Sequence, residues 1–222
     1  MAYPLNFYAF GVPLRIGVFG GTFDPPHRGH LAVAEAARDR LGLDKVLLVV
    51  AGDPWQKSPN RVVSPAVDRL AMVTALVHGA DGRTLPGLDV SDIEIRRGGP
   101  SYTVTTLREL AIIEPGAEFF LIIGRDLVEG FPTWHEASEI ERLATIVVAD
   151  RPGHAASLRP GWRSLEIDAI DVSSSDLRER LQAGRDVLGD VPAAVIAEIG
   201  SRGLYGARSG QGTPTVDAGR RS

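Results

Sequence analysis

The chain has 222 residues, a formal net charge of −4, and 44% hydrophobic against 23% charged residues, the composition of a globular protein with one domain of ordinary size. The absence of cysteine excludes disulfides, thiolate catalysis and cysteine-ligated zinc, and it fits a cytoplasmic protein. No apolar run approaches the roughly 20 residues of a membrane span. The negative net charge disfavours a general nucleic-acid binder, so we expect neither membrane nor nucleic acid as a partner.

Strand-like and helix-like segments alternate along the chain. Apolar, β-branched runs predict buried strands, and apolar residues at helical spacing predict the helices between them. In chain order we expect a strand over 16–19, a helix over 31–41, a strand over 46–51, a helix over 65–78, a strand over 88–95, a helix over 103–112, strands over 119–123, 144–149 and 165–170, and helices over 177–183 and 193–199. Apolar strands separated by helices form a parallel sheet covered on both faces. The pattern therefore predicts a single-domain, Rossmann-like, doubly wound α/β fold, with its ligand cleft at the carboxyl ends of the strands.

The two ends of the chain differ from this region. The first residues are apolar and aromatic but lack the basic start and aliphatic core of a signal peptide. We expect an N-terminal extension over 1–13 and the α/β domain over 14–205. Residues 206–222 are mostly Gly, Ser, Thr and Arg, which predicts a disordered tail.

Residues 15–31 carry the strongest functional signal. An apolar strand leads to Gly20 and Gly21, where a backbone can turn sharply and approach a ligand. His27 and His30 follow, at the start of the helix expected over 31–41. A strand, a glycine turn and a helix N-terminus direct unpaired N–H groups at an anion. The two imidazoles, three residues apart on one face, can both donate to phosphate oxygens.

A second polar segment begins at Ser173. Ser173 with Asp176 three residues later is typical of a helix N-cap, and this is the simplest interpretation of the segment. Arg178 also suits phosphate binding, because a guanidinium binds phosphate through two hydrogen bonds and stays charged. Both interpretations stay open from the residues alone.

Other polar residues follow the expected strands. Asp126, just after the buried strand 119–123, is placed to accept from ribose hydroxyls at the cleft edge. Trp134 is either a core residue or a stacking surface for an aromatic ring. Asp92 and Glu94 fall on one face of the strand expected over 88–95, and we interpret that face as solvated.

Residues 20–30, Gly-Gly-Thr-Phe-Asp-Pro-Pro-His-Arg-Gly-His, resemble the signature of the nucleotidylyltransferase superfamily, a His-x-x-His beside a glycine turn. In its longer form the segment resembles that of the bacterial nicotinate mononucleotide adenylyltransferases. Further matches to that family follow in the same order over residues 14–205: Ser101-Tyr102-Thr103, Gly124 with Asp126, Phe131-Pro132-Thr133-Trp134, Arg151-Pro152-Gly153, and Ser173-Ser174 with Arg178. Neither a Walker-type phosphate loop nor a Gly-x-Gly-x-x-Gly pattern is present.

The resemblance implies transfer of the adenylyl group of ATP to nicotinate mononucleotide, giving deamido-NAD and pyrophosphate. It implies His27, His30 and Arg178 as catalytic residues. It implies that ATP contacts Gly20, Gly21, Thr22, Phe23, His27, His30, Gly124, Asp126, Arg151, Ser173, Ser174 and Arg178. It implies that the mononucleotide contacts Lys57, Tyr102, Thr103 and Trp134. It also implies Mg²⁺, which we expect to be carried mostly by ATP and water because the sequence offers no all-protein carboxylate cage. The oligomeric state stays open, a homo-oligomer included.

Three positions depart from the family pattern. Ser175 stands where threonine is usual and keeps the hydroxyl, Thr105 stands where aspartate is usual, and Arg125 stands where smaller or amide residues are common. Two alternatives remain. Phosphopantetheine adenylyltransferase shares the histidine and serine motifs but is shorter and lacks the Ser-Tyr-Thr and Phe-Pro-Thr-Trp segments. A non-catalytic nucleotide sensor on the same fold would release no pyrophosphate.

Overall fold

The computed structural model describes residues 12–54, 63–78, 83–150, 158–167 and 172–206. Within these ranges six strands form one sheet: β1 (Arg15–Gly21), β2 (Lys45–Val50), β3 (Leu88–Ser91), β4 (Glu118–Gly124), β5 (Ala144–Asp150) and β6 (Arg163–Glu166). All neighbouring strands are parallel, in the order β3-β2-β1-β4-β5-β6. This is the strand order of a Rossmann-like sheet, whose direction of winding reverses between β1 and β4. The predicted fold class is confirmed.

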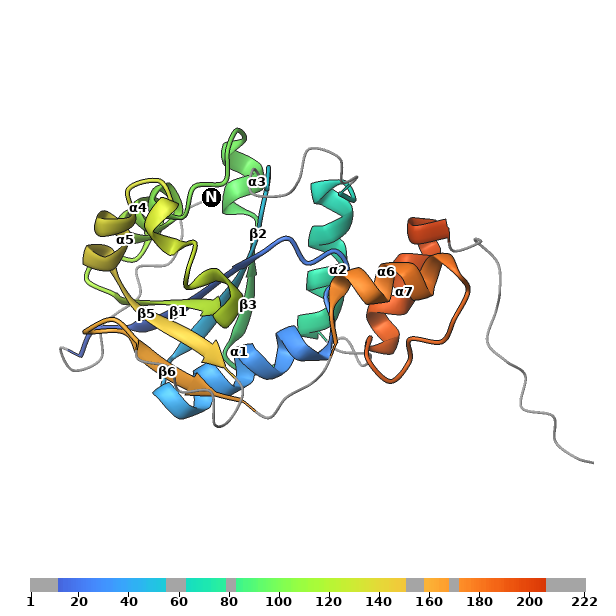
Figure 1. Ribbon diagram of the computed structural model, residues 1–222, viewed down its shortest axis with the longest axis horizontal. Helices are drawn as coiled ribbons and strands as arrows, with labels where there is room; N and C mark the ends of the chain where they lie inside the picture. Colours follow the sequence, from blue (N-terminus) through green and yellow to red (C-terminus); the bar gives the residue numbers. More distant parts are fainter. Residues whose placement is uncertain (1–11, 55–62, 79–82, 151–157, 168–171, 207–222) are drawn as a thin grey trace, which may run out of the picture.

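Helices cover both faces of the sheet (Figure 1). They are α1 (Arg28–Leu41), α2 (Ala66–His78), α3 (Ile93–Arg97), α4 (Thr103–Ile113), α5 (Ala137–Leu143), α6 (Ser174–Gln182) and α7 (Ala193–Ser201), with short 3₁₀ turns η1 (Arg125–Leu127), η2 (Phe131–Thr133) and η3 (Leu204–Gly206). Alternate strand residues enter two separate cores. Leu48 and Ile122 pack with α1 and α2, whereas Val49 and Ile123 pack with α4 and α5. The period-2 geometry of a strand thus buries both faces.

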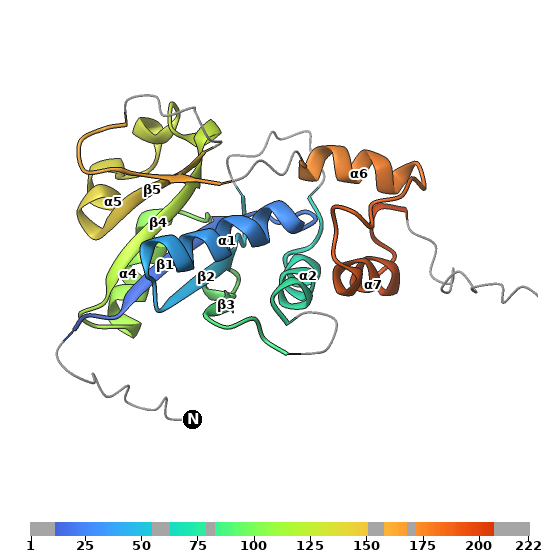
Figure 2. The ribbon, with the colours of Figure 1, turned by 90° about the horizontal axis from the view of Figure 1, so that it is seen from below.

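The last two helices, α6 and α7, extend the core on the α2 side of the sheet. Leu177 of α6 and Val195 and Ile199 of α7 are fully buried in the same cluster as Met72 and Leu76 of α2. Figure 2 shows α6 and α7 beside α2, at the end of the molecule to which the N-terminus of α1 points. The C-terminal segment is therefore placed to contact the loop between β1 and α1.

The strand predicted over 88–95 is wrong in its second half. β3 ends at Ser91, and α3 follows over Ile93–Arg97. The Ser91 hydroxyl accepts from the Ile93 N–H (3.4 Å), a local hydrogen bond of the kind that favours helix starts over strands. The predicted solvated face is also wrong, because Glu94 is buried (7% exposed).

The last strand begins earlier than predicted. It was predicted over 165–170, but β6 covers Arg163–Glu166, and residues 168–170 lie outside the described residues. Its register pairs Asp150, the last residue of β5, with Glu166. The Ile167 N–H then donates to the Asp150 carbonyl (2.9 Å). β6 therefore ends where β5 ends.

The described residues begin at 12 and end at 206, so most of the predicted N-terminal extension (1–13) and C-terminal tail (206–222) lies outside them. In the part of the chain that the structure describes, no helix has the length and apolar character needed to cross a bilayer.

Candidate active site

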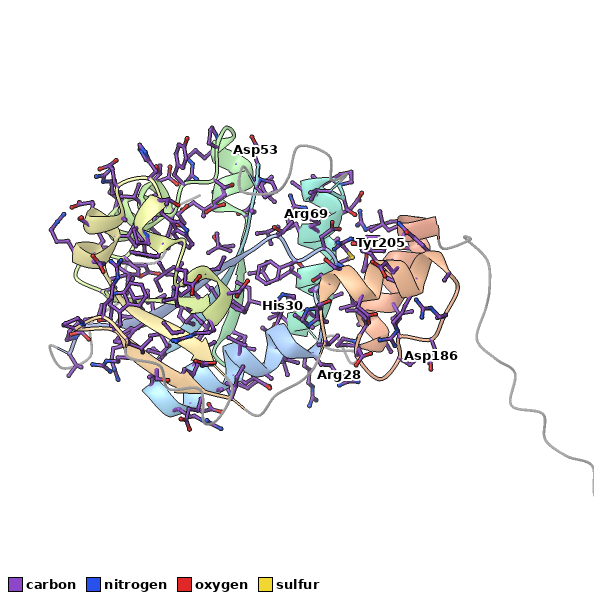
Figure 3. The ribbon with its side chains drawn as sticks, in the orientation of Figure 1. Arg28, His30, Asp53, Arg69, Asp186 and Tyr205 are labelled. Carbon is purple, nitrogen blue, oxygen red and sulfur yellow. The ribbon has the colours of Figure 1, made fainter. Side chains whose placement is uncertain are left out.

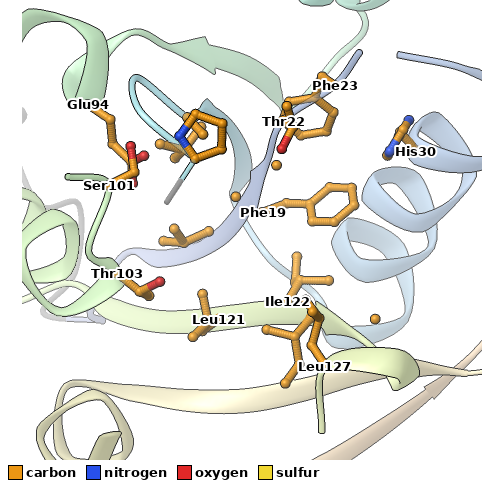
Figure 4. Close-up of a pocket in the computed structure, with 18 of the residues that line it drawn as sticks. Phe19, Thr22, Phe23, His30, Glu94, Ser101, Thr103, Leu121, Ile122 and Leu127 are labelled. Carbon is orange, nitrogen blue, oxygen red and sulfur yellow. The ribbon is translucent and has the colours of Figure 1, made fainter. Parts of the chain in front are cut away.

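A cavity of about 570 Å³ lies where the carboxyl ends of β1 and β4 diverge. Its wall is formed by the end of β1 and the following loop, the end of β4, the segment 101–103, Trp134 and His135, and residues 172–175. Figure 4 shows part of this wall, with His30 of α1 on one side and Ser101 and Thr103 on the other. The cavity occupies the crevice predicted for a doubly wound sheet.

The loop after β1 turns later than predicted. β1 runs through Gly20 and Gly21, and the chain leaves the extended conformation at Phe23, which has φ 52°. A Cβ on Gly21 would lie 2.7 Å from the Phe23 ring, whereas the corresponding position at Gly20 is open. Gly21 is therefore required for the packing of Phe23, and Gly20 leaves open space beside the cavity.

The two histidines meet at the N-terminus of α1. Their ring centroids are 3.7 Å apart, and the His27 N–H donates to His30 Nδ1 (3.2 Å). Because Nδ1 of His30 accepts, the proton of the neutral ring lies on Nε2, which can donate to a ligand oxygen. The His30 ring also packs edge-on against Phe23, with centroids 5.0 Å apart. The structure thus places both predicted imidazoles in the cavity wall.

His27 is neutral at pH 7. Burial lowers its pKa to about 4, although the negative charge of Asp190 opposes this effect. Its side chain is almost fully enclosed (6% exposed), and Nδ1 is buried without a hydrogen-bond partner. An unpaired buried polar atom is costly. The neutral imidazole of His27 lines the cavity, while its Nδ1 faces Gly29, where an added Cβ would lie 3.0 Å away.

The start of α6 lies against residues 22–27, the loop between β1 and α1 that carries His27 and is called the histidine loop below. Ser173 Oγ accepts from the Asp176 N–H (3.1 Å), which confirms the predicted N-cap. Ser174 Oγ donates to the Pro25 carbonyl (2.9 Å). Residues 173–175 line the cavity. The phosphate interpretation of this segment is compatible with the N-cap, because the cap and the cavity use the same helix N-terminus.

Arg178 links α6 to the loop after β1. Its Nη1 donates to the carbonyls of Asp24 (2.7 Å) and Ser174 (3.0 Å), and its Nη2 donates to Ser175 Oγ (3.0 Å). Arg178 is not one of the described residues that line the cavity. In this structure it supports the cavity wall, and a role in phosphate binding would add to these contacts.

Aromatic side chains form another part of the cavity wall. The ring of Tyr102, just before α4, lies 4.5 Å from that of His135. Trp134 lines the cavity and also packs on Phe131 (5.2 Å), so it contributes to the core, and its role as a stacking surface for a ligand ring stays a prediction. Ser101 Oγ accepts from the N–H groups of Gly52 and Asp53 (3.0 and 3.2 Å), which joins the loops after β2 and before α4. His135, which also lines the cavity, was not predicted from the sequence.

The end of β4 supplies Gly124 and Asp126. A Cβ on Gly124 would lie 2.5 Å from Asp126 Oδ1, so a side chain at position 124 would displace this carboxylate from its present position. Arg125, the departure from the family pattern, forms an ion pair with the buried Asp150 (3.6 Å). Two predicted contacts, Lys57 and Arg151, lie outside the described residues.

Arg69 is a second residue near the cavity that was not predicted from the sequence. It is 1% exposed, and its guanidinium donates to the carbonyls of Thr22, Ala51 and Ser64 (2.9, 2.7 and 2.9 Å). Burial lowers the pKa of Arg69, and the negative charge of Asp24 opposes the shift. Arg69 therefore fixes the ends of three loops at the cavity. Its place on the apolar face of α2, three residues before Met72, is the signal that could have identified it.

The sequence of the chain matches a known protein family. The model of the cytidylyltransferase-like family matches residues 18–180. A Dehalococcoides mccartyi protein named "Probable nicotinate-nucleotide adenylyltransferase" is 43% identical over 206 residues, covering 87% of this chain and 98% of the relative. A Streptomyces coelicolor protein of the same name is 44% identical over 191 residues, covering 84% and 98%.

Solved structures show the same fold. Nicotinic acid mononucleotide adenylyltransferase of Plasmodium falciparum, complexed with NaAD, superposes with a TM-score of 0.72 at 18% identity, covering 87% of this chain and 98% of that one. A putative nicotinate-nucleotide adenylyltransferase from Vibrio parahaemolyticus gives a TM-score of 0.63 at 24% identity, covering 86% and 94%. Together with the family match and the curated relatives, these results show that the chain belongs to the cytidylyltransferase-like family, among the nicotinate-nucleotide adenylyltransferases.

Proposed function

We propose that this chain transfers the adenylyl group of ATP to nicotinate mononucleotide, producing deamido-NAD and pyrophosphate. The observation that carries the proposal is one cavity with two kinds of wall. The His27–His30 pair and the start of α6 offer donors for phosphates, and Tyr102 and Trp134 offer aromatic surfaces for a pyridine ring. Relatives that are more than 40% identical over most of the chain carry the name of this activity.

The chemistry needs no covalent intermediate with the enzyme. The mononucleotide phosphate attacks the α-phosphorus of ATP, the new P–O bond forms, and the bond to pyrophosphate breaks. The protein aligns the two anions and stabilises the charge that develops on the phosphoryl oxygens. We assign His27, His30 and Arg178 to this role. The ATP contacts would be Gly20, Gly21, Thr22, Phe23, Gly124, Asp126, Arg151, Ser173 and Ser174, and the mononucleotide contacts Lys57, Tyr102, Thr103 and Trp134.

A divalent cation would enter with ATP. Among the described residues, no group of three or more His, Asp or Glu side chains is arranged to hold a metal ion. Mg²⁺ binds through phosphate oxygens and waters together with few protein groups in many nucleotide enzymes. Mg²⁺ bound mainly by the triphosphate would neutralise charge on the leaving pyrophosphate. We place the reaction in the cytoplasm, in line with a chain that contains no cysteine.

Release of pyrophosphate against a panel of acceptors tests the proposal. We expect release from ATP and Mg²⁺ with nicotinate mononucleotide and little with phosphopantetheine. Faster release with phosphopantetheine would favour the related adenylyltransferase. ATP binding without release for any acceptor would favour a nucleotide sensor.

A further inference from the structure

The end of the described chain reaches back to the histidine loop. Tyr205, in η3, has φ 55° and ψ 27°, a left-handed conformation that is uncommon for residues other than glycine. Such strain persists only where surrounding contacts enforce it, and it concentrates at functional sites. Among the described residues, Phe23, Glu136 and Tyr205 are the non-glycine residues with positive φ. Two of them, Phe23 and Tyr205, adjoin the same residue, Asp24: one along the chain and one through a hydrogen bond.

Asp24 receives hydrogen bonds from distant parts of the chain. Its side chain is 1% exposed, and Oδ1 accepts from the Tyr205 hydroxyl at 2.6 Å. Oδ2 accepts from the Ser64 N–H (3.4 Å) just before α2. Its backbone carbonyl accepts from Arg178. Because a buried carboxylate needs donors to remain stable, each contact also fixes the loop that carries Asp24.

The Tyr205 hydroxyl stays protonated and can therefore donate to Asp24. Burial and the hydrogen bond to Asp24 both raise the pKa of Tyr205, so the hydroxyl keeps its proton at neutral pH. The ring enters beside α2, where its hydroxyl lies 3.9 Å from Met72 Sδ. Figure 3 shows Tyr205 near Arg69, on the α2 side of the molecule. Tyr205 therefore contacts the α2 side of the histidine loop, while Arg178 contacts its backbone.

We propose that Tyr205 is a positioning residue of the active site: its hydroxyl fixes Asp24, and through Asp24 it fixes the loop 22–27 that presents His27 to the cavity. The inference rests on the proposed adenylyl transfer. Two further contacts act beside it: the Ser174 hydroxyl donates to the Pro25 carbonyl of the same loop, and the Arg28 N–H at the start of α1 donates to the Asp190 carbonyl (2.9 Å). The segment 173–205 thus holds the loop at successive residues, and Tyr205 supplies the contact to its buried carboxylate.

The Tyr205→Phe variant tests the hydroxyl alone. Loss of this contact loosens donors that act on transition-state charge, so we expect kcat to fall roughly tenfold while KM for both substrates changes less than about threefold. Arg202→Gln is the matched control. Arg202 bonds Asp68 at the start of α2 (2.7 Å), so this variant weakens the attachment of the same C-terminal segment without touching Asp24. We expect its kcat to stay within about twofold of the wild type.

A second measurement does not depend on activity. The imidazole of His27 can be titrated by NMR, and its pKa of about 4 reflects burial. If Tyr205 positions the loop, the His27 titration should move toward higher pH in Tyr205→Phe and stay unchanged in Arg202→Gln.

Asp24→Asn is the substitute variant if Tyr205→Phe does not fold. The amide keeps the size of the carboxylate but has one oxygen, so it cannot accept from both the Ser64 N–H and the Tyr205 hydroxyl in this geometry. The same shift of the His27 titration is expected.

The outcomes separate the two proposals. A wild-type chain that forms no dinucleotide contradicts the proposed function, and the His27 titration then decides the positioning role alone. A Tyr205→Phe variant with unchanged kcat and an unchanged His27 titration overturns the inference. Equal losses of activity in Tyr205→Phe and Arg202→Gln overturn it as well, because both would then reflect attachment of the C-terminal segment.

Discussion

At the scale of single residues, the site depends on two imidazoles held close together. His30 receives the His27 N–H at Nδ1, so its Nε2–H can donate to a ligand. We expect His30→Ala to lower kcat by a factor on the order of 10² to 10³, the loss of one preorganised donor to transition-state charge. Steady-state pyrophosphate release measures the effect. His78→Ala, at a surface histidine that bonds the Thr74 carbonyl, is the control and should keep full activity. Near wild-type turnover in His30→Ala would refute the assignment.

The buried His27 also makes stability depend on pH. Its folded pKa of about 4 lies below the unfolded value of 6.5, so the unfolded chain binds more protons between these values. The contribution of neutral, buried His27 to the free energy of unfolding is therefore fully present above pH 6.5 and is lost as the pH falls toward 4. The difference of 6.5 − 4 = 2.5 pKa units corresponds to about 3 kcal/mol in the free energy of unfolding.

Urea unfolding at pH 7, 5.5 and 4.5 measures this loss. His27→Gln is the comparison, because glutamine does not titrate and the carboxylates of the chain contribute equally to both proteins. We expect the wild type to lose more stability than the variant over this range. Parallel losses in the two proteins would show that His27 does not titrate on unfolding.

At the scale of elements, α3 and α4 are joined by a buried polar contact. Thr106 Oγ1 donates to Glu94 Oε1 at 2.6 Å, and Arg97 bonds the same hydroxyl. Thr106→Val would leave the Glu94 carboxylate buried without this donor, so we expect a loss of about 1–3 kcal/mol in unfolding free energy. Thr105→Val is the control. It makes the same change one residue earlier, at a side chain with no such contact to Glu94, and should change stability little. Equal stabilities of the two variants would contradict this account.

The elements also show what could be predicted from sequence. β1, β2, β4 and β5 were predictable because their apolar runs are local signals, and the histidines because they follow such a run. α3 was not, because five residues carry too short a pattern to distinguish a helical turn from a strand end. Arg69 and Tyr205 were not assigned roles either. Their partners are backbone carbonyls and a carboxylate that only the fold brings near.

At the scale of the whole molecule, the cavity is assembled from both halves of the sheet. The loop after β1 supplies His27, α1 supplies His30, and the end of β4 with η1 supplies Gly124 and Asp126. Residues 172–175 close the wall from the C-terminal side. Arg69 joins the loops after β1 and β2 through the Thr22 and Ala51 carbonyls, and Arg178 joins α6 to the loop after β1 through the Asp24 carbonyl. Each arginine therefore couples segments whose relative positions the sheet alone leaves independent. The site is therefore a property of the fold as a whole, with the ligand crevice at the switch point between β1 and β4.

This arrangement predicts a preference between two closely related acceptors. Nicotinate mononucleotide carries a negative carboxylate where nicotinamide mononucleotide carries a neutral amide. α4 begins at Thr103 in the cavity wall, and the first N–H groups of a helix, at the positive end of its dipole, favour an anion. Trp134 would stack on either ring, so stacking adds affinity without discriminating between them.

We therefore expect the acid to be used at least about tenfold more efficiently than the amide, a difference of about 1.4 kcal/mol in transition-state binding. Charge-assisted hydrogen bonds of roughly 1.5–3 kcal/mol are sufficient for this preference. The ratio of kcat/KM for the two mononucleotides, at identical ATP and Mg²⁺ concentrations, measures it. Thr103→Val keeps the backbone N–H groups and should keep most of the preference, whereas Thr103→Pro removes one N–H and should reduce it. Equal efficiencies in the wild type, or a preference for the amide, would show that the start of α4 does not bind the pyridine carboxylate.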